Sequence, residues 1–98
     1  MVSSGRLRQI KSWLRTRLSL AEAREHYVSL ERATLQLLET TGGWVACFER
    51  ELFSQALPED EFWLYDAGGD AWANLHGEKG MALVRDGEVV AFMLESRN

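Results

Sequence analysis

Three side chains are soft or imidazole groups that could carry nucleophilic or metal chemistry: Cys47, His26 and His76. A cysteine–histidine nucleophile needs its imidazole beside a stabilised thiolate, and no local signature brings these residues together. Cys47 lies in an alternating stretch, where a cysteine is usually a small buried hydrophobe. We therefore expect a structural role for Cys47 and keep an enzyme that uses it as a distant alternative.

The other polar patterns are too sparse for a metal or phosphate site. Glu22 and His26 lie four residues apart on one helix face, but a zinc site needs three or four ligands, so we expect a solvated i,i+4 pair. The segment HGEKG, at 76–80, lacks the spacing and the preceding strand of a phosphate-binding loop. The acidic run at 59–61 is typical of a solvated loop. We expect no catalytic, cofactor-binding or metal-binding residues, and hence a protein that is not an enzyme.

Charge is distributed unevenly along the chain, whose net charge is −4. Residues 1–24 hold six positive charges and one negative charge, whereas residues 25–98 hold five positive and fourteen negative charges, so a +5 segment precedes a −9 body. Such asymmetry indicates an interaction surface. We therefore predict a partner-binding set in the basic segment, consisting of Arg6, Arg8, Lys11, Trp13, Arg15 and Arg17.

The basic segment has four alternative roles. Its apolar stripe can pack on the protein's own domain, which is the usual fate of an amphipathic helix. It can instead enter a groove of another protein, contact nucleic-acid phosphates, or lie on a membrane surface or act as a transit peptide. We prefer packing on the protein's own domain or a second copy, with the cations at the surface.

Length and composition indicate a single small globular domain over residues 1–98. Hydrophobic residues make up 46% of the 98 and charged residues 27%, which is ordinary for a folded domain with a modest core. No apolar run approaches the roughly 18 residues that a membrane span needs, and no secretory signal is evident. The single cysteine cannot form an internal disulfide, which favours a cytoplasmic location.

Two helices are predicted in the first half of the chain. The first covers about 4–18, where four apolar residues recur at helical spacing. The second covers about 20–41, because Ser19 and Glu22 form a capping box and Gly42–Gly43 can end the helix. The stripe of the first helix consists of Leu7, Ile10, Leu14 and Leu18.

A sheet is predicted over about 44–95. Apolar and polar residues alternate from Trp44 to Phe53, which indicates a strand. A second, aromatic strand covers Phe62 to Tyr65, and Asp70 to His76 is expected to form one helical turn capped by Asp70.

The last predicted feature is a hairpin around Asp86–Gly87, which is a typical type I′ turn sequence. Its expected pairs are Arg85 with Glu88, Leu83 with Val90, and Met81 with Phe92. The fold class is therefore α+β, with two N-terminal helices followed by a small antiparallel β-sheet ending in a type I′ β-hairpin.

These patterns predict a small, non-enzymatic protein–protein interaction domain. It would act as a regulator, inhibitor or accessory subunit of a larger assembly, and its partner could present a basic surface that otherwise holds nucleic acid. The alternative is a nucleic-acid-associated accessory protein that binds through its basic N-terminal helix. A homo-oligomer is compatible with either function.

Overall fold

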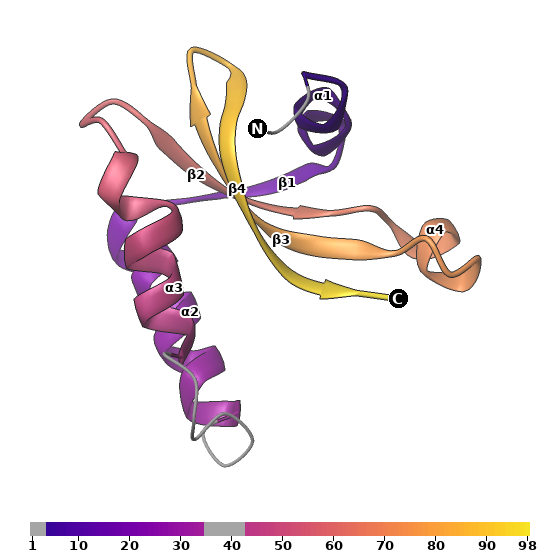
Figure 1. Ribbon diagram of the computed structural model, residues 1–98, viewed down its shortest axis with the longest axis horizontal. Helices are drawn as coiled ribbons and strands as arrows, with labels where there is room; N and C mark the ends of the chain where they lie inside the picture. The colour runs from indigo at the N-terminus through magenta and orange to yellow at the C-terminus, as the bar shows by residue number, and fades with distance from the viewer. Residues whose placement is uncertain (1–3, 35–42) are drawn as a thin grey trace.

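The computed structural model of the protein describes residues 4–34 and 43–98, which form a four-stranded antiparallel sheet with helices on both faces (Figure 1). This confirms the α+β class and the antiparallel sheet. The predicted order is wrong, because a strand separates the first two helices. No described helix has the length and apolar character needed to cross a membrane. In chain order the elements are α1 (Ser4–Ser12), β1 (Leu14–Leu18), α2 (Leu20–Thr34), α3 (Gly43–Glu51), η1 (Phe53–Gln55), β2 (Glu61–Asp66), α4 (Gly69–Ala73), β3 (Glu78–Arg85) and β4 (Glu88–Arg97).

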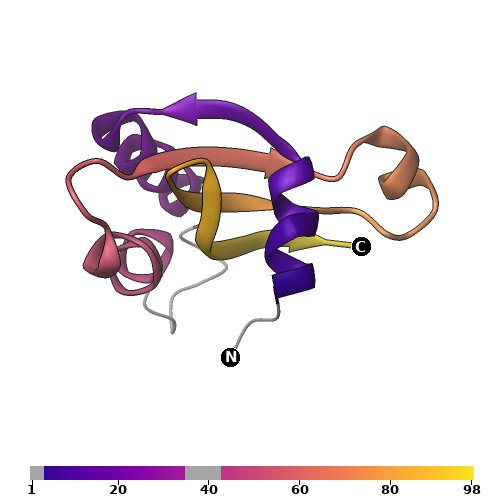
Figure 2. The same ribbon diagram turned by 90° about the horizontal axis from the view of Figure 1, so that it is seen from above.

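The sheet is buried on both faces where β3 runs through its middle, in the strand order β1-β2-β3-β4. Met81 and Leu83 point to one face and are fully buried, while Ala82 and Val84 point to the other and are at most 4% exposed. Because neighbouring side chains of a strand alternate between faces, two layers must cover the sheet. Helices α2 and α3 form one layer, and α1 lies across the strands as the other (Figures 1 and 2).

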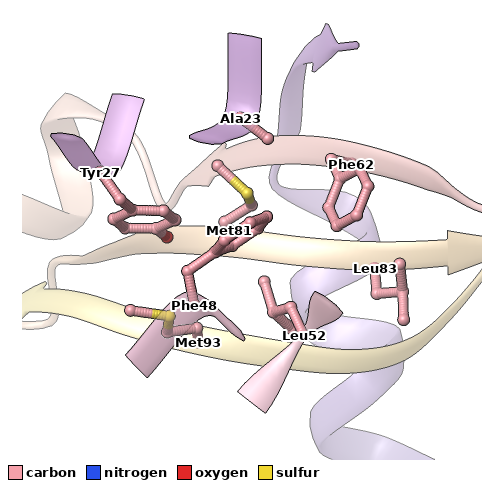
Figure 3. Close-up of a cluster of buried hydrophobic side chains, with 8 residues drawn as sticks. All are labelled: Ala23, Tyr27, Phe48, Leu52, Phe62, Met81, Leu83 and Met93. Atoms are coloured by element: carbon pink, nitrogen blue, oxygen red, sulfur yellow. The ribbon is translucent and has the colours of Figure 1, made fainter. Parts of the chain in front are cut away.

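The face beneath α2 and α3 carries the larger core cluster (Figure 3). Tyr27 of α2 and Phe48 of α3 lie with their ring centroids 5.4 Å apart, and Phe48 is 5.5 Å from Phe62 of β2. Aromatic rings at such separations add to the stability gained by burying their area. The cluster consists of Ala23, Tyr27, Phe48, Leu52, Phe62, Met81, Leu83 and Met93.

The opposite face is covered by α1. Ile10 is fully buried there, and Trp13 stacks on Tyr65 with ring centroids 6.3 Å apart. Tyr65 lies over Gly80, where a Cβ atom would stand 2.9 Å from the tyrosine hydroxyl oxygen and 2.1 Å from the Met93 carbonyl oxygen. Position 80 therefore has to be glycine for α1 and Tyr65 to close on this face.

The predicted helix over 4–18 is wrong beyond Ser12. The sequence LRTRL forms β1, which pairs with β2 from Leu14 opposite Tyr65 to Leu18 opposite Phe62. A register shift between Leu14 and Thr16 directs Leu14 to the face of α1 and Leu18 to the face of α2. Leucines four residues apart share a face in a helix and in a regular strand; pairing with β2 selects the strand, and the register shift then sends the two leucines to opposite faces.

The predicted strand from Trp44 to Phe53 is also wrong, because Gly43–Glu51 is the helix α3. Trp44, Phe48 and Leu52 are spaced by four, so they share a face in either conformation. In the structure Phe48 and Leu52 are fully buried against the sheet. The helix thus places on the core the same side chains that a strand would have presented on one face.

The predicted capping box at the start of α2 is confirmed. The Ser19 N–H donates to the Glu22 carboxylate at 2.9 Å, and the Glu22 N–H donates to the Ser19 hydroxyl at 3.1 Å. These bonds hold the pKa of Glu22 below its usual range because they favour the charged carboxylate. The predicted end of this helix at 41 and its Gly42 stop lie outside the described residues.

The short helix before β3 differs slightly from its prediction. Helix α4 covers Gly69–Ala73, and Gly68 rather than Asp70 occupies the N-cap position, with no side-chain capping bond. The aromatic strand predicted at Phe62–Tyr65 is confirmed as part of β2.

The hairpin turn lies where the sequence predicts it, but most of the predicted register is wrong. Arg85 pairs with Glu88, and Asp86 and Gly87 have φ of 54° and 79°. The turn type stays a prediction. Beyond Val84 the strands shift by one residue at Val90, so the next pairs are Leu83 with Ala91, Ala82 with Phe92 and Met81 with Met93. The predicted core face is therefore split, since Phe92 packs on the α1 side while Val90 and Leu94 are exposed.

The positive φ of Gly87 in the turn predicts that its change to alanine costs stability, whereas the same change at Gly69, outside the turn, does not. Gly87→Ala should destabilise the protein by about 1 kcal/mol, because a side chain disfavours positive φ. Gly69→Ala is the matched control, since Gly69 has open space around its Cβ position and no positive φ. It should be neutral or stabilise by up to about 1 kcal/mol. Urea unfolding of both variants checks this, and equal midpoints would contradict it.

The capping box predicts that Ser19→Ala lowers the free energy of unfolding by about 1 kcal/mol. Ser29→Ala on the same helix is the control, because Ser29 is exposed and makes only a 3.4 Å bond to Glu25. It should change stability by less than about 0.5 kcal/mol. Thermal unfolding followed by circular dichroism measures both. A Ser19→Ala variant as stable as the control would argue against the cap.

Candidate functional site

The six predicted partner-binding residues are divided between α1, the link that follows it and β1. On α1, Arg6 donates to the buried Glu78 carboxylate and lies over the Phe92 ring, 5.1 Å from its centroid. Lys11 is exposed and donates to Glu88 at 2.8 Å. These cations therefore help to hold α1 against β3 and β4. Cation–π contacts and exposed ion pairs each contribute modestly to stability.

The remaining predicted residues differ in how far they are engaged. The Arg15 Nε–H donates to the Asp66 carbonyl at 3.1 Å, and Arg17 lies 3.4 Å from the Glu61 carboxylate. Arg8 is exposed and makes no hydrogen bond or ion pair with any residue that the structure describes. Trp13 is half-buried beneath α1. The structure thus separates the set into residues that pack α1 on the sheet (Arg6, Lys11 and Trp13), residues on β1 (Arg15 and Arg17) and the exposed Arg8.

Glu78 is the polar centre of the α1 face. It is 5% exposed and accepts from the Tyr65 hydroxyl at 2.9 Å as well as from Arg6, with Arg97 at 3.9 Å. Burial raises the pKa of Tyr65, and the bond to Glu78 raises it further. Tyr65 is therefore a neutral donor, and a buried carboxylate needs such partners to offset its lost hydration.

Glu95 occupies the equivalent place on the α2 face, where its side chain is 7% exposed. It accepts from the Tyr27 hydroxyl at 2.8 Å, and the His26 Nε2 atom lies 3.1 Å away. Burial raises the pKa of Tyr27, and the Glu95 charge raises it further. We interpret this group as a support for the fold, with His26 at the border of a surface cleft.

The residues considered for catalysis are not brought together as a nucleophile pair. The Cys47 thiol lies on α3 and accepts from the Arg50 guanidinium at 3.4 Å, whereas His26 faces Glu95 and His76 is exposed between α4 and β3. Residues 4–34 and 43–98 contain no group of three or more side chains placed to hold a metal ion.

Strand β1 forms one border of the sheet (Figure 2). It pairs with β2 on one side, and within the described residues no strand pairs with its other side. The central residues of this strand, Arg15, Thr16 and Arg17, are all exposed. An edge strand of this kind presents backbone N–H and C=O groups that another chain can use.

A cleft of about 400 Å³ adjoins the C-terminal end of β1. Its apolar walls include Leu20, which is 40% exposed, Leu57, which is 53% exposed, and the exposed Phe53 and Pro58. Leu18 of β1 also lines this cleft. This concentration of exposed apolar side chains distinguishes the cleft from a solvated surface, because such groups gather where a partner or ligand binds.

A second cleft, of about 290 Å³, adjoins the N-terminal end of β1. Arg15, Lys79 and His26 line it together with Asp66 and Glu95. The acidic groups already have donors: a single Asp66 oxygen accepts from the Gly68 N–H and the Trp72 indole, and Glu95 accepts as described above. Arg15 and Lys79 also lie close enough to Asp66 to lower the pKa of its carboxyl, so the cleft brings cations and acids together.

No family model, curated protein or solved structure matches the chain. Its function is accordingly argued from the side chains of the β1 edge and the two clefts. Sequence patterns alone did not predict this site, because Leu20, Phe53 and Leu57 converge only in the folded chain. The alternation in LRTRL is the one local signal that could have indicated an edge strand.

The contacts of α1 predict different effects for two neighbouring arginines. Arg6→Gln should destabilise the protein by about 2 kcal/mol, since it leaves the buried Glu78 charge with fewer donors. Arg8→Gln should change stability by less than about 0.5 kcal/mol. Chemical denaturation of both variants tests this. Equal stability of the two would show that Glu78 does not depend on Arg6.

Proposed function

We propose that this protein is a small, non-enzymatic protein–protein interaction domain that binds its partner at the β1 edge. The supporting observation is the apolar cleft beside that edge, in which Leu20, Phe53, Leu57 and Pro58 remain exposed. A domain of this size gains stability by burying such side chains. Their exposure at one place is better explained by burial in a complex.

The proposed role is that of a regulator, inhibitor or accessory subunit, and it is supported by the exposed apolar cleft beside the β1 edge. A cytoplasmic location belongs to the same proposal and is supported by the single cysteine, Cys47. The nucleic-acid alternative has less support. Arg6, Lys11 and Arg17 each have a carboxylate partner within the protein, so phosphate groups would have to compete with these acids.

The apolar cleft predicts that Leu57→Glu abolishes partner binding and leaves the fold intact, because Leu57 is largely exposed and a charge there opposes burial in an interface. Leu75→Glu is the matched control: Leu75 is 73% exposed and lies between α4 and β3. Immobilised wild type and both variants are compared by capture from an extract of the native host and quantitative mass spectrometry.

The expected result is a partner that wild type and Leu75→Glu retain and Leu57→Glu loses, with matching circular dichroism for all three proteins. Equal capture by all three would contradict the proposed role of the cleft.

A further inference from the structure

We infer that the apolar cleft beside β1 binds a basic segment of the partner, in which a bulky apolar side chain is flanked on both sides by lysine or arginine. This inference rests on the proposed function and specifies the partner's chemistry. The cleft of about 400 Å³ is lined by the end of β1, the start of α2 and the segment from η1 to β2, and its exposed apolar residues include Leu20, Phe53 and Leu57. A few side chains buried in such pockets carry most of the binding energy of an interface.

The cations beside the cleft already have acidic partners. Arg17 lies 3.4 Å from the Glu61 carboxylate. Arg24 lies over the Phe53 ring, 5.0 Å from its centroid, and donates to Glu49 at 3.1 Å. Both guanidinium charges are therefore offset by a neighbouring carboxylate, and neither calls for an acidic partner.

Two carboxylates beside the same cleft lack a cationic partner among the described residues. Glu22 is exposed, and its described bonds are those of the capping box with Ser19, which lines the cleft. Glu59 is exposed, makes no hydrogen bond or ion pair with any residue that the structure describes, and stands in the chain between two residues that line the cleft. The other acid there, Asp60, is already paired with Arg85 at 2.7 Å. The charge left around the cleft is negative, which favours a basic segment.

The layer that carries the cleft is acidic as a whole. Its described residues from 19 to 61 hold eight negative and three positive charges, and the net charge of the chain is −4. A field of this sign speeds the approach of a basic partner and opposes that of nucleic acid. The cleft thus combines apolar walls with acidic surroundings, which complement a basic segment that has an apolar anchor.

A second copy of this chain does not supply such a segment. The basic part of the protein is α1 with β1, and its apolar side chains are already used on its own sheet. Ile10 is fully buried, Leu7 and Leu14 pack against the same cluster, and Leu18 packs against the main core. Withdrawing them to fill the cleft of another copy would leave cavities in the core. The occupant is therefore a different chain.

The probe for this inference is a capped hexapeptide with leucine and phenylalanine at its centre and two lysines at each end. It is titrated into the whole protein labelled with ¹⁵N, and amide shifts are measured. The expected result is saturable binding, with the largest shifts at Leu18, Leu20, Phe53 and Leu57.

Two peptides of equal length are the controls for charge and for the apolar anchor. In the first, glutamates replace the lysines, and it should bind about tenfold more weakly or not at all, because like charges then meet around the cleft. In the second, serines replace the central pair, and it should show no saturable binding because nothing fills the apolar cleft.

A double variant, Glu22→Gln with Glu59→Gln, should weaken binding of the lysine peptide about fivefold, since exposed charge pairs are individually modest. Glutamine still fits the capping box, so the fold should be kept, which circular dichroism checks. The matched control, Asp70→Asn with Glu88→Gln, removes the same charge from exposed positions that do not line the cleft. It should change binding by less than about twofold. Added salt should weaken binding to the wild type more than binding to the first double variant.

The inference is overturned if the lysine peptide does not bind, if either control peptide binds as tightly, or if the two double variants weaken binding equally. It is also overturned if single-stranded nucleic acid shifts the same amides, or if sedimentation shows a dimer that the lysine peptide dissociates.

The Leu57→Glu variant separates this inference from the proposed function. Its charge lies among the apolar walls rather than beside Glu22 or Glu59, so it tests the cleft for a basic partner as well. Failure of the lysine peptide together with loss of the native partner in Leu57→Glu rejects the basic segment and leaves the interaction domain standing. Retention of the native partner by Leu57→Glu rejects the apolar cleft itself.

Discussion

The burial of β3 on both faces is the constraint on which the rest of the structure depends. Met81, Ala82, Leu83 and Val84 are four consecutive residues with at most 4% exposure. Antiparallel sheets often leave one face to water, but this strand gives neither face a polar surface. The chain therefore needs two covering layers, and it supplies them from α2 and α3 on one side and from α1 on the other.

Covering both faces also buries a carboxylate at the margin of each. Glu78 and Glu95 lie on the C-terminal strands, and their donors come largely from N-terminal segments. Arg6 reaches Glu78 and Tyr27 reaches Glu95, so each hydrogen bond closes a long loop of the chain. A buried charge without such donors is costly. The start of the basic segment thus serves the fold, while its later arginines remain on the surface of β1.

The division of the basic segment leaves β1 exposed at the border of the sheet. Both helical layers centre on β3 and its neighbours, and β1 is left with one strand beside it. The apolar residues that meet next to Leu18 come from three separate segments, and Leu20, Phe53 and Leu57 among them stay 36–53% exposed. Exposed arginines on the same strand oppose pairing with an identical edge. The β1 border therefore combines exposed apolar side chains with exposed arginines.

The sequence by itself determined those features whose hydrogen bonds close within a few residues. The Ser19–Glu22 capping box and the position of the Asp86–Gly87 turn depend only on local backbone and side-chain geometry. Tertiary structure decided between helix and strand in the segments whose apolar spacing is compatible with both. Residues 14–18 and 44–52 both carry apolar side chains four apart, a spacing found in helices and in strands. Residues 14–18 form a strand because they pair with the edge of β2. Residues 43–51 form a helix because its buried side chains pack on the face of the sheet. The register shift at Val90 was also decided by the tertiary structure, because packing on both faces of the sheet, rather than the local pattern, sets the register of β4.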